Sequence, residues 1–135
     1  MPGKKRILVV DDEPGIQATL RARLEANGYE VLLESDGEAG LQRAREEKPD
    51  LILLDLMLPR RDGYSVCRLL KFDNRFHHIP IIMLTARAQE RDRSLGQKTG
   101  ADAYVTKPFD AAHLLETIRR LLAAGEDPPA GGDTP

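Results

Sequence analysis

Five polar side chains follow short apolar runs of the sequence and are of the types that bind divalent cations and phosphate. They are Asp11, Asp12, Asp55, Thr85 and Lys107. Clustered carboxylates need protons or a cation, because two unit charges about 4 Å apart repel by roughly 4 kcal/mol at an effective dielectric constant near 20. Oxygen ligands favour Mg²⁺ over zinc. A carboxylate in such a cluster, with lysine and threonine donors beside it, could accept a phosphoryl group.

The apolar runs before these residues predict the strands that position them. Four runs without polar alternation cover 7–10, 31–33, 51–54 and 81–84. Such runs are typical of strands that are buried on both faces, as in parallel sheets. A weaker fifth run covers 103–106.

Helical periodicity fills the gaps between these runs. Pro14 begins the first predicted helix, and Asp36 and Asp110 can cap the second and the last. The apolar positions of the third helix are Val66, Leu69 and Leu70. The fourth, over 89–99, carries one large apolar residue, Leu95, so we expect it to be the least stable helix. The pattern predicts a (βα)5 α/β fold with helices on both faces of one parallel sheet.

The position of the five polar residues favours one shared site. Taken singly, each has an ordinary structural explanation, since Asp after a strand commonly caps the next helix. All five, however, stand at the carboxyl ends of predicted strands. Ligands of open α/β sheets bind outside that edge of the sheet. The sequence therefore predicts a binding or catalytic site there.

Length and charge exclude several classes of function. The 135 residues make one domain, over 5–124, and the segment 125–135 has three Gly and three Pro, as a flexible tail or a truncated linker would. Twenty basic against 22 acidic residues disfavour direct nucleic-acid binding through a basic face. Cys67 is the single cysteine, which excludes an internal disulfide. No apolar run is long enough to span a membrane, and we expect a cytoplasmic protein.

Four segments together resemble the response-regulator receiver domain of two-component signalling. Their sequences are VVDDEP (9–14), DLMLPRRDG (55–63), IIMLTA (81–86) and GADAYVTKPF (100–109). The resemblance covers about residues 5 to 124. It implies a flavodoxin-like, doubly wound sandwich like that of the chemotaxis receiver, with the parallel sheet order 2-1-3-4-5.

The resemblance also implies a phosphoacceptor and a metal site. Asp55 would take a phosphoryl group from the phosphohistidine of a sensor histidine kinase or of a phosphotransfer protein. Mg²⁺, or Mn²⁺ in its place, would be held by Asp12, Asp55 and the backbone carbonyl of Met57. Asp11 would join this metal site through water. The chain would then be a signalling receiver that catalyses only its own phosphoryl transfer and dephosphorylation.

Further residues would bind the phosphoryl group or change conformation when it is bound. Thr85 and Lys107 would contact phosphoryl oxygens, and the Lys107–Pro108 peptide would be cis. Tyr104 resembles an aromatic switch that turns inward when Thr85 moves toward the phosphate. The switch would change the face formed by the fourth helix, the fifth strand and the fifth helix. A downstream protein or output domain would bind at that face.

Two other pairs of positions bear on phosphoryl lifetime and on assembly. Met57 and Arg87 stand two residues beyond Asp55 and Thr85, where they could restrict the approach of water to an acyl phosphate. Regulators with a winged-helix output usually have an acid and an arginine at the places of Ala103 and Thr117. The sequence therefore leaves open a monomer or a phosphorylation-dependent dimer.

Three alternatives share parts of this pattern. A metal-dependent phosphohydrolase with an aspartyl-phosphate intermediate usually has a second Asp two residues after its nucleophile, where this chain has Met57. A flavin carrier would have a Ser-, Thr- and Gly-rich phosphate loop in place of Asp11-Asp12-Glu13. A pseudo-receiver would act only as a protein-interaction module, although every residue type that phosphorylation needs is present.

Overall fold

The computed structural model describes residues 3–85 and 100–126, which contain one five-stranded parallel sheet. The strands are β1 (Arg6–Val10), β2 (Glu30–Glu34), β3 (Leu51–Asp55), β4 (Ile81–Thr85) and β5 (Ala103–Thr106). They lie in the order β2-β1-β3-β4-β5, and every neighbouring pair is parallel. The predicted strands and the predicted sheet order are confirmed.

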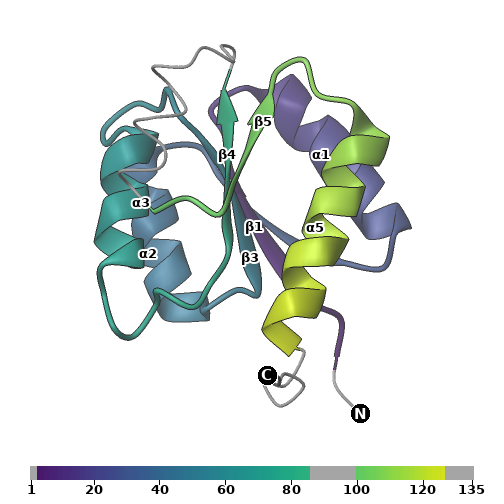
Figure 1. The fold of residues 1–135 in the computed structure, drawn as a ribbon. Helices are drawn as coiled ribbons and strands as arrows, with labels where there is room; N and C mark the ends of the chain where they lie inside the picture. The colour runs from purple at the N-terminus through teal and green to yellow at the C-terminus, as the bar shows by residue number, and fades with distance from the viewer. Residues whose placement is uncertain (1–2, 86–99, 127–135) are drawn as a thin grey trace.

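Helices cover both faces of the sheet. They are α1 (Pro14–Ala26), α2 (Gly37–Glu47), α3 (Gly63–Lys71) and α5 (Ala111–Glu126). Figure 1 shows α1 and α5 on one face and α2 and α3 on the other. The predicted fourth helix, over 89–99, lies outside the described residues. No helix of the described ranges is long and apolar enough to cross a bilayer.

Two apolar clusters hold these layers together. Successive residues of a strand point to opposite faces of the sheet. In β1, Leu8 therefore packs toward α2 and α3, whereas Ile7 and Val9 pack toward α1 and α5. All of β3 and β4 is buried. This two-sided burial explains why the strands appear in the sequence as unbroken apolar runs.

Aspartate caps set the starts of three helices. The Asp36 carboxylate accepts a hydrogen bond from the Ala39 amide at 2.8 Å, and Asp110 accepts one from Ala112 at 2.9 Å. Both predicted caps are confirmed. A third cap, Asp62, accepts from the Ser65 amide at 2.8 Å and fixes the start of α3 just beyond β3.

The first residue of α3, Gly63, packs against the backbone of the β3 end. A Cβ atom there would lie 2.3 Å from the carbonyl oxygen of Asp55 and 2.9 Å from Cα of Leu56. The Gly63 amide also donates a hydrogen bond to the Leu56 carbonyl at 2.9 Å. Any side chain at residue 63 would therefore push on the backbone that carries Asp55.

We expect Gly63→Ala to lower the free energy of unfolding by about 3 kcal/mol, at the upper end of the usual cost of overpacking. Chemical denaturation measures this. Gly15→Ala is the matched control, because Gly15 lies in α1 with nothing within 4 Å of the added Cβ. That change should be neutral or stabilise by up to about 1 kcal/mol. Equal unfolding midpoints for wild type and Gly63→Ala would contradict the steric argument.

Candidate functional site

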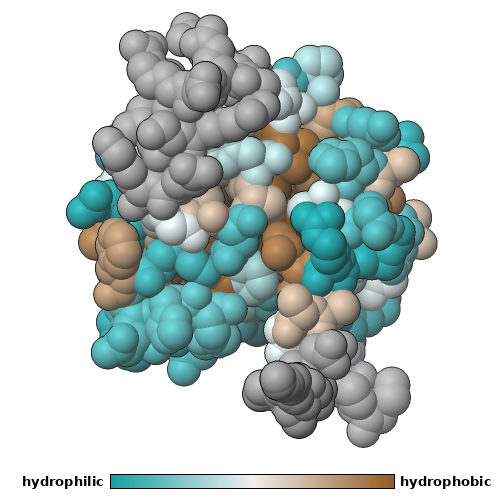
Figure 2. Space-filling view, in the orientation of Figure 1, coloured by the Kyte–Doolittle hydropathy of each residue, from teal (hydrophilic) through white to brown (hydrophobic). Residues whose placement is uncertain are grey.

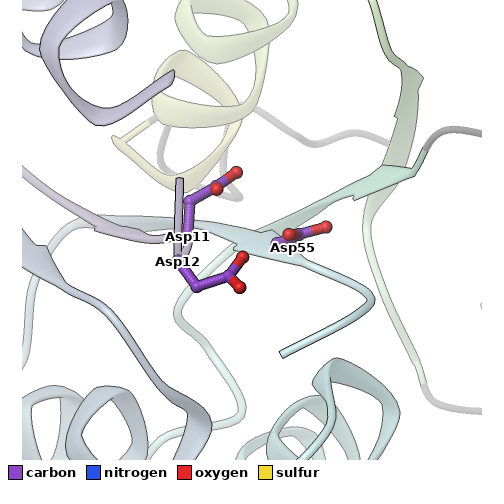
Figure 3. Close-up of side chains that lie close together, drawn as sticks. All are labelled: Asp11, Asp12 and Asp55. Carbon is purple, nitrogen blue, oxygen red and sulfur yellow. The ribbon is translucent and has the colours of Figure 1, made fainter. Parts of the chain in front are cut away.

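Three carboxylates meet at the carboxyl edge of the sheet because of the register between β1 and β3. Val10 pairs with Leu54 in that register, so Asp11 and Asp55 follow at the same level on neighbouring strands. One oxygen from each of Asp11, Asp12 and Asp55 lies within 4.8 Å of the other two. Figure 3 shows Asp11 and Asp12 beyond the end of β1, with Asp55 beside them on β3.

Lys107 places its ammonium group between the two buried carboxylates of this cluster. Asp11 has no exposed surface and Asp55 is 6% exposed. The Lys107 Nζ atom lies 2.9 Å from Asp11 Oδ2 and 3.4 Å from Asp55 Oδ2. The backbone amide of Lys107 donates to the Thr85 carbonyl at 2.6 Å, which fixes the residue beside the end of β4. The peptide bond between Lys107 and Pro108 is cis.

Burial and charge oppose each other at Asp55 and Lys107. Burial raises the pKa of the Asp55 carboxyl, and the charge of Asp11 raises it further. Lys107 and the Met57 amide only partly offset this rise. Burial would lower the pKa of the Lys107 ammonium, but the hydrogen bond to Asp11 and the charges of both carboxylates raise it overall. One ammonium therefore faces an excess of negative charge.

The donor set fits a hard divalent cation. The cluster offers only carboxylate oxygens, which are the preferred ligands of Mg²⁺ and Ca²⁺, and it lacks the thiolates and imidazoles of most zinc sites. Asp12 is exposed, so a cation can enter from solvent without disturbing the buried pair. The excess of negative charge at Asp11 and Asp55 provides the electrostatic reason for it to bind.

Gln17 on α1 holds the turn that carries Asp11, a role that no sequence pattern indicates. Its side-chain amide donates to the carbonyl oxygens of Asp11, at 2.7 Å, and of Glu34, at 3.0 Å. The Asp11 amide donates to the same Glu34 carbonyl at 3.1 Å. Gln17 thus ties the ends of β1 and β2 together directly behind the carboxylates.

We expect Gln17→Leu to weaken cation binding about tenfold, within the usual effect of removing a group that orients ligands. Leucine fills a similar volume but leaves two carbonyl oxygens without this donor. Titration with MgCl₂, followed by NMR, measures the change. Gln42→Leu is the matched control, because within the described part of the chain the Gln42 amide donates only to exposed Glu46 on α2. An unchanged affinity in Gln17→Leu would remove this positioning role.

Thr85 and Tyr104 lie on the same face of the sheet. Tyr104 on β5 pairs in register with Met83 on β4, and Thr85 lies two residues beyond Met83. Thr85 is 3% exposed and Tyr104 is half-buried. The two predicted switch residues are therefore diagonal neighbours on this face, with Thr85 at the edge that carries the acidic cluster.

Met57, one of the two positions assigned to phosphoryl lifetime, lies beside Asp55. The Met57 side chain is 76% exposed, and its amide donates to Asp55 Oδ1 at 3.4 Å. It therefore flanks the phosphoacceptor candidate on the solvent side. Arg87 lies outside the described residues, so the lifetime hypothesis stays a prediction.

Comparison with known proteins agrees with this geometry. The model of the response regulator receiver domain matches residues 7–119. The alkaline phosphatase synthesis transcriptional regulatory protein PhoP of Bacillus subtilis is 47% identical over 122 residues, which are 90% of this chain and 50% of that protein. The chain thus spans about half the length of the curated relatives it matches.

Two solved structures share the fold over nearly their whole length. A CheY-like response regulator receiver domain protein from Methanospirillum hungatei superposes with a TM-score of 0.85 at 32% identity, over 92% of this chain and 98% of that one. The receiver domain of sensor histidine kinase PA1611 from Pseudomonas aeruginosa, with a magnesium ion in its active-site cleft, gives 0.83 at 36% identity, over 90% and 99%. The chain described here belongs to the family of response regulator receiver domains, which are signalling modules.

Proposed function

We propose that the chain accepts a phosphoryl group on Asp55 from the phosphohistidine of a sensor histidine kinase or phosphotransfer protein, in a reaction that needs Mg²⁺ or Mn²⁺. One observation carries this proposal. The nearly buried Asp55 carboxylate shares the sheet edge with Asp11 and Asp12 and lies 3.4 Å from the Lys107 ammonium. The magnesium ion in the related PA1611 receiver domain supports the choice of metal.

The transfer is a displacement at phosphorus. A carboxylate oxygen of Asp55 forms the new P–O bond while the P–N bond to the donor imidazole breaks, and the imidazole nitrogen keeps the electron pair and takes up a proton. Lys107 and Thr85 donate hydrogen bonds to the phosphoryl oxygens, whose charge they help to balance. Asp12, Asp55 and the Met57 carbonyl would hold the cation, with Asp11 acting through water. When bound, that cation supplies further neutralisation of phosphoryl charge.

The phosphoryl group then acts as a switch. It adds roughly −1.5 to −2 charge, and it shifts a conformational equilibrium only as far as its contacts are better in one state. Thr85 moves toward the phosphate, and Tyr104 follows on the same face of the sheet. The face formed by the predicted fourth helix, β5 and α5 then binds a downstream protein or an output domain. The chain itself turns over no external substrate, since Met57 stands where a general acid would be needed.

The direct test is phosphoryl uptake from acetyl phosphate, followed by intact mass and by peptide mapping. We expect a single added phosphoryl group on Asp55 with Mg²⁺ present and none after treatment with EDTA. Label on another residue, or uptake that EDTA leaves unchanged, would overturn the proposal. Phosphotransfer from candidate histidine kinases then identifies the physiological donor.

Cation affinity should fall as the pH is lowered. Burial and the charge of Asp11 raise the pKa of Asp55, so protons compete with the cation from a higher pH than at an ordinary carboxyl. In the cation-free protein, ionised Asp55 lowers the free energy of unfolding. This destabilisation is absent at a pH below the ordinary pKa of the carboxyl and is complete above its raised pKa. Mg²⁺ titration at pH 5 and pH 7 checks this, with weaker binding expected at pH 5. Equal affinities at the two values would contradict it.

A further inference from the structure

We propose that the outer side of α3 and the turn after it bind an acidic protein segment that carries a large apolar side chain. The α3 surface, as we name it, consists of Arg45, Arg68, Leu69, Phe72 and Arg75, which line one open hollow. It lies apart from the acidic site, and nothing in the proposed phosphoryl transfer uses it.

The apolar part of the α3 surface is exposed without a structural need. Phe72 is 67% exposed and Leu69 is 39% exposed; among the described residues, the only other exposed large apolar side chain is Met57. Three residues apart at the end of a helix, they share one face. Figure 2 shows hydrophobic residues at the outer edge of the molecule, on the side where Figure 1 places α3, bordered by hydrophilic ones.

The core does not require these two side chains. The inner face of α3 already packs on the sheet through Val66, Cys67 and Leu70, all of which are buried. Exposed apolar side chains grouped together and rimmed by polar ones are typical of protein interaction sites. Leu69 and Phe72 therefore remain available for a partner.

The charge around them is positive, although the whole chain has a net charge of −2. Three arginines line the hollow, against one acid, Asp73. Hydrogen bonds from Arg75 lower the pKa of Asp73 to about 2, and the charge of Arg45 makes a smaller contribution in the same direction. No ion pair involves Arg45 or Arg68 within residues 3–85 and 100–126. Two guanidinium groups thus stay available for carboxylates of a partner.

Helix electrostatics explains only part of this arrangement. Arg45 and Arg68 lie in the last turns of their helices, where positive charge is favourable. That effect does not account for the exposed Phe72 ring, over which the Arg68 guanidinium lies at 5.4 Å. Arginine is one of the residue types enriched among the side chains that contribute most to binding at protein interfaces, and its guanidinium is attracted to the face of an aromatic ring.

The surface is also held in shape before any partner arrives. The amides of Phe76 and His77 donate to the Asp73 carbonyl at 3.0 and 2.9 Å. The Arg75 guanidinium is fixed by two hydrogen bonds to Asp73. A rigid surface loses little conformational entropy on binding. A partner can therefore bind while Asp55 stays accessible, because the nine residues of α3, about 14 Å of helix, separate the two places.

The test uses a synthetic helical peptide of Glu, Ala, Leu and Phe, with Leu and Phe on one face, titrated into the full ¹⁵N-labelled chain. We expect shifts confined to the α3 surface, weaker binding at high salt, and about tenfold weaker binding for Phe72→Ser and for Arg68→Gln. Arg21→Gln, which removes an exposed arginine from α1, should bind like wild type. Circular dichroism verifies that the variants fold.

Three outcomes would overturn the proposal. The first is a dissociation constant above about 1 mM, which is too weak for specific recognition. The second is a lack of selectivity, seen either as equal binding of a peptide with Lys in place of Glu or as shifts outside the α3 surface. The third is tighter binding of single-stranded DNA, which arginine and aromatic side chains also recognise. None of these outcomes depends on phosphorylation. The proposal that Asp55 accepts a phosphoryl group can therefore be tested independently of this one.

Discussion

An Asp55→Asn variant is expected to take up no phosphoryl group and, without divalent cations, to be more stable than the wild type near neutral pH. The amide keeps the shape of the carboxylate but is not a nucleophile, so phosphorylation is lost completely. The stability gain has a different cause. Burial and repulsion from Asp11 disfavour the ionised Asp55 carboxylate, and the neutral amide escapes both effects. We expect a gain of about 1 kcal/mol, since Lys107 and solvent already reduce the repulsion.

Intact mass after treatment with acetyl phosphate and chemical denaturation in EDTA measure the two effects separately. Asp110→Asn is the matched control, because Asn caps a helix about as well as Asp and residue 110 lies outside the site. It should label like wild type and unfold at the same midpoint. A labelled Asp55→Asn variant, or one less stable than wild type in EDTA, would contradict the assignment of Asp55.

Replacing Lys107 by methionine should have the largest effect on stability. The ammonium contacts Asp11, which has no exposed surface, and Asp55. Removing one partner of a buried ion pair leaves an uncompensated charge and typically costs about 3 to 5 kcal/mol. We expect a loss of that size in EDTA and a partial recovery in Mg²⁺. Phosphoryl uptake should fall about 100-fold, as when a donor to a developing charge is removed.

Two further variants separate the effect of the Lys107 charge from that of the rest of its side chain. Lys107→Arg keeps a cation and should lose much less stability than Lys107→Met. The double variant Lys107→Met, Asp11→Asn should regain part of the stability, because only one of the two buried carboxylates, that of Asp55, then lacks the ammonium. Thermal unfolding with and without MgCl₂ measures both. If Lys107→Met is as stable as Lys4→Met, an exposed control, then the buried pair contributes nothing to folding.

The strands were predictable because parallel sheets bury both of their faces. Each apolar run became a strand, and Asp36 and Asp110 cap helices as their positions indicate. The sheet order came from the resemblance and not from the pattern. Leu69 shows the limit of periodicity, since it belongs to the apolar stripe of α3 but is exposed. Which residues of an apolar stripe contact the sheet depends on how the helix packs. In a short helix this cannot be predicted from periodicity.

The acidic cluster was predictable because the ends of parallel strands converge on one edge. Gln17 was not, since its role depends on two backbone carbonyls that only the β1–β2 register brings together. Thr117 stands where an arginine would make a dimer contact, yet it is 2% exposed and its hydroxyl donates to the His113 carbonyl at 2.9 Å. A sequence shows the type of a residue but not whether solvent reaches it.

The ion pair between Asp11 and Lys107 joins residues 96 positions apart. A ribosome delivers the chain from its N-terminus, so Asp11 emerges 96 residues before Lys107. During that part of translation the growing polypeptide has its aspartates without their internal countercharge. The Asp11 and Asp55 carboxylates gain this countercharge only once β5, which directly precedes Lys107, has joined the sheet.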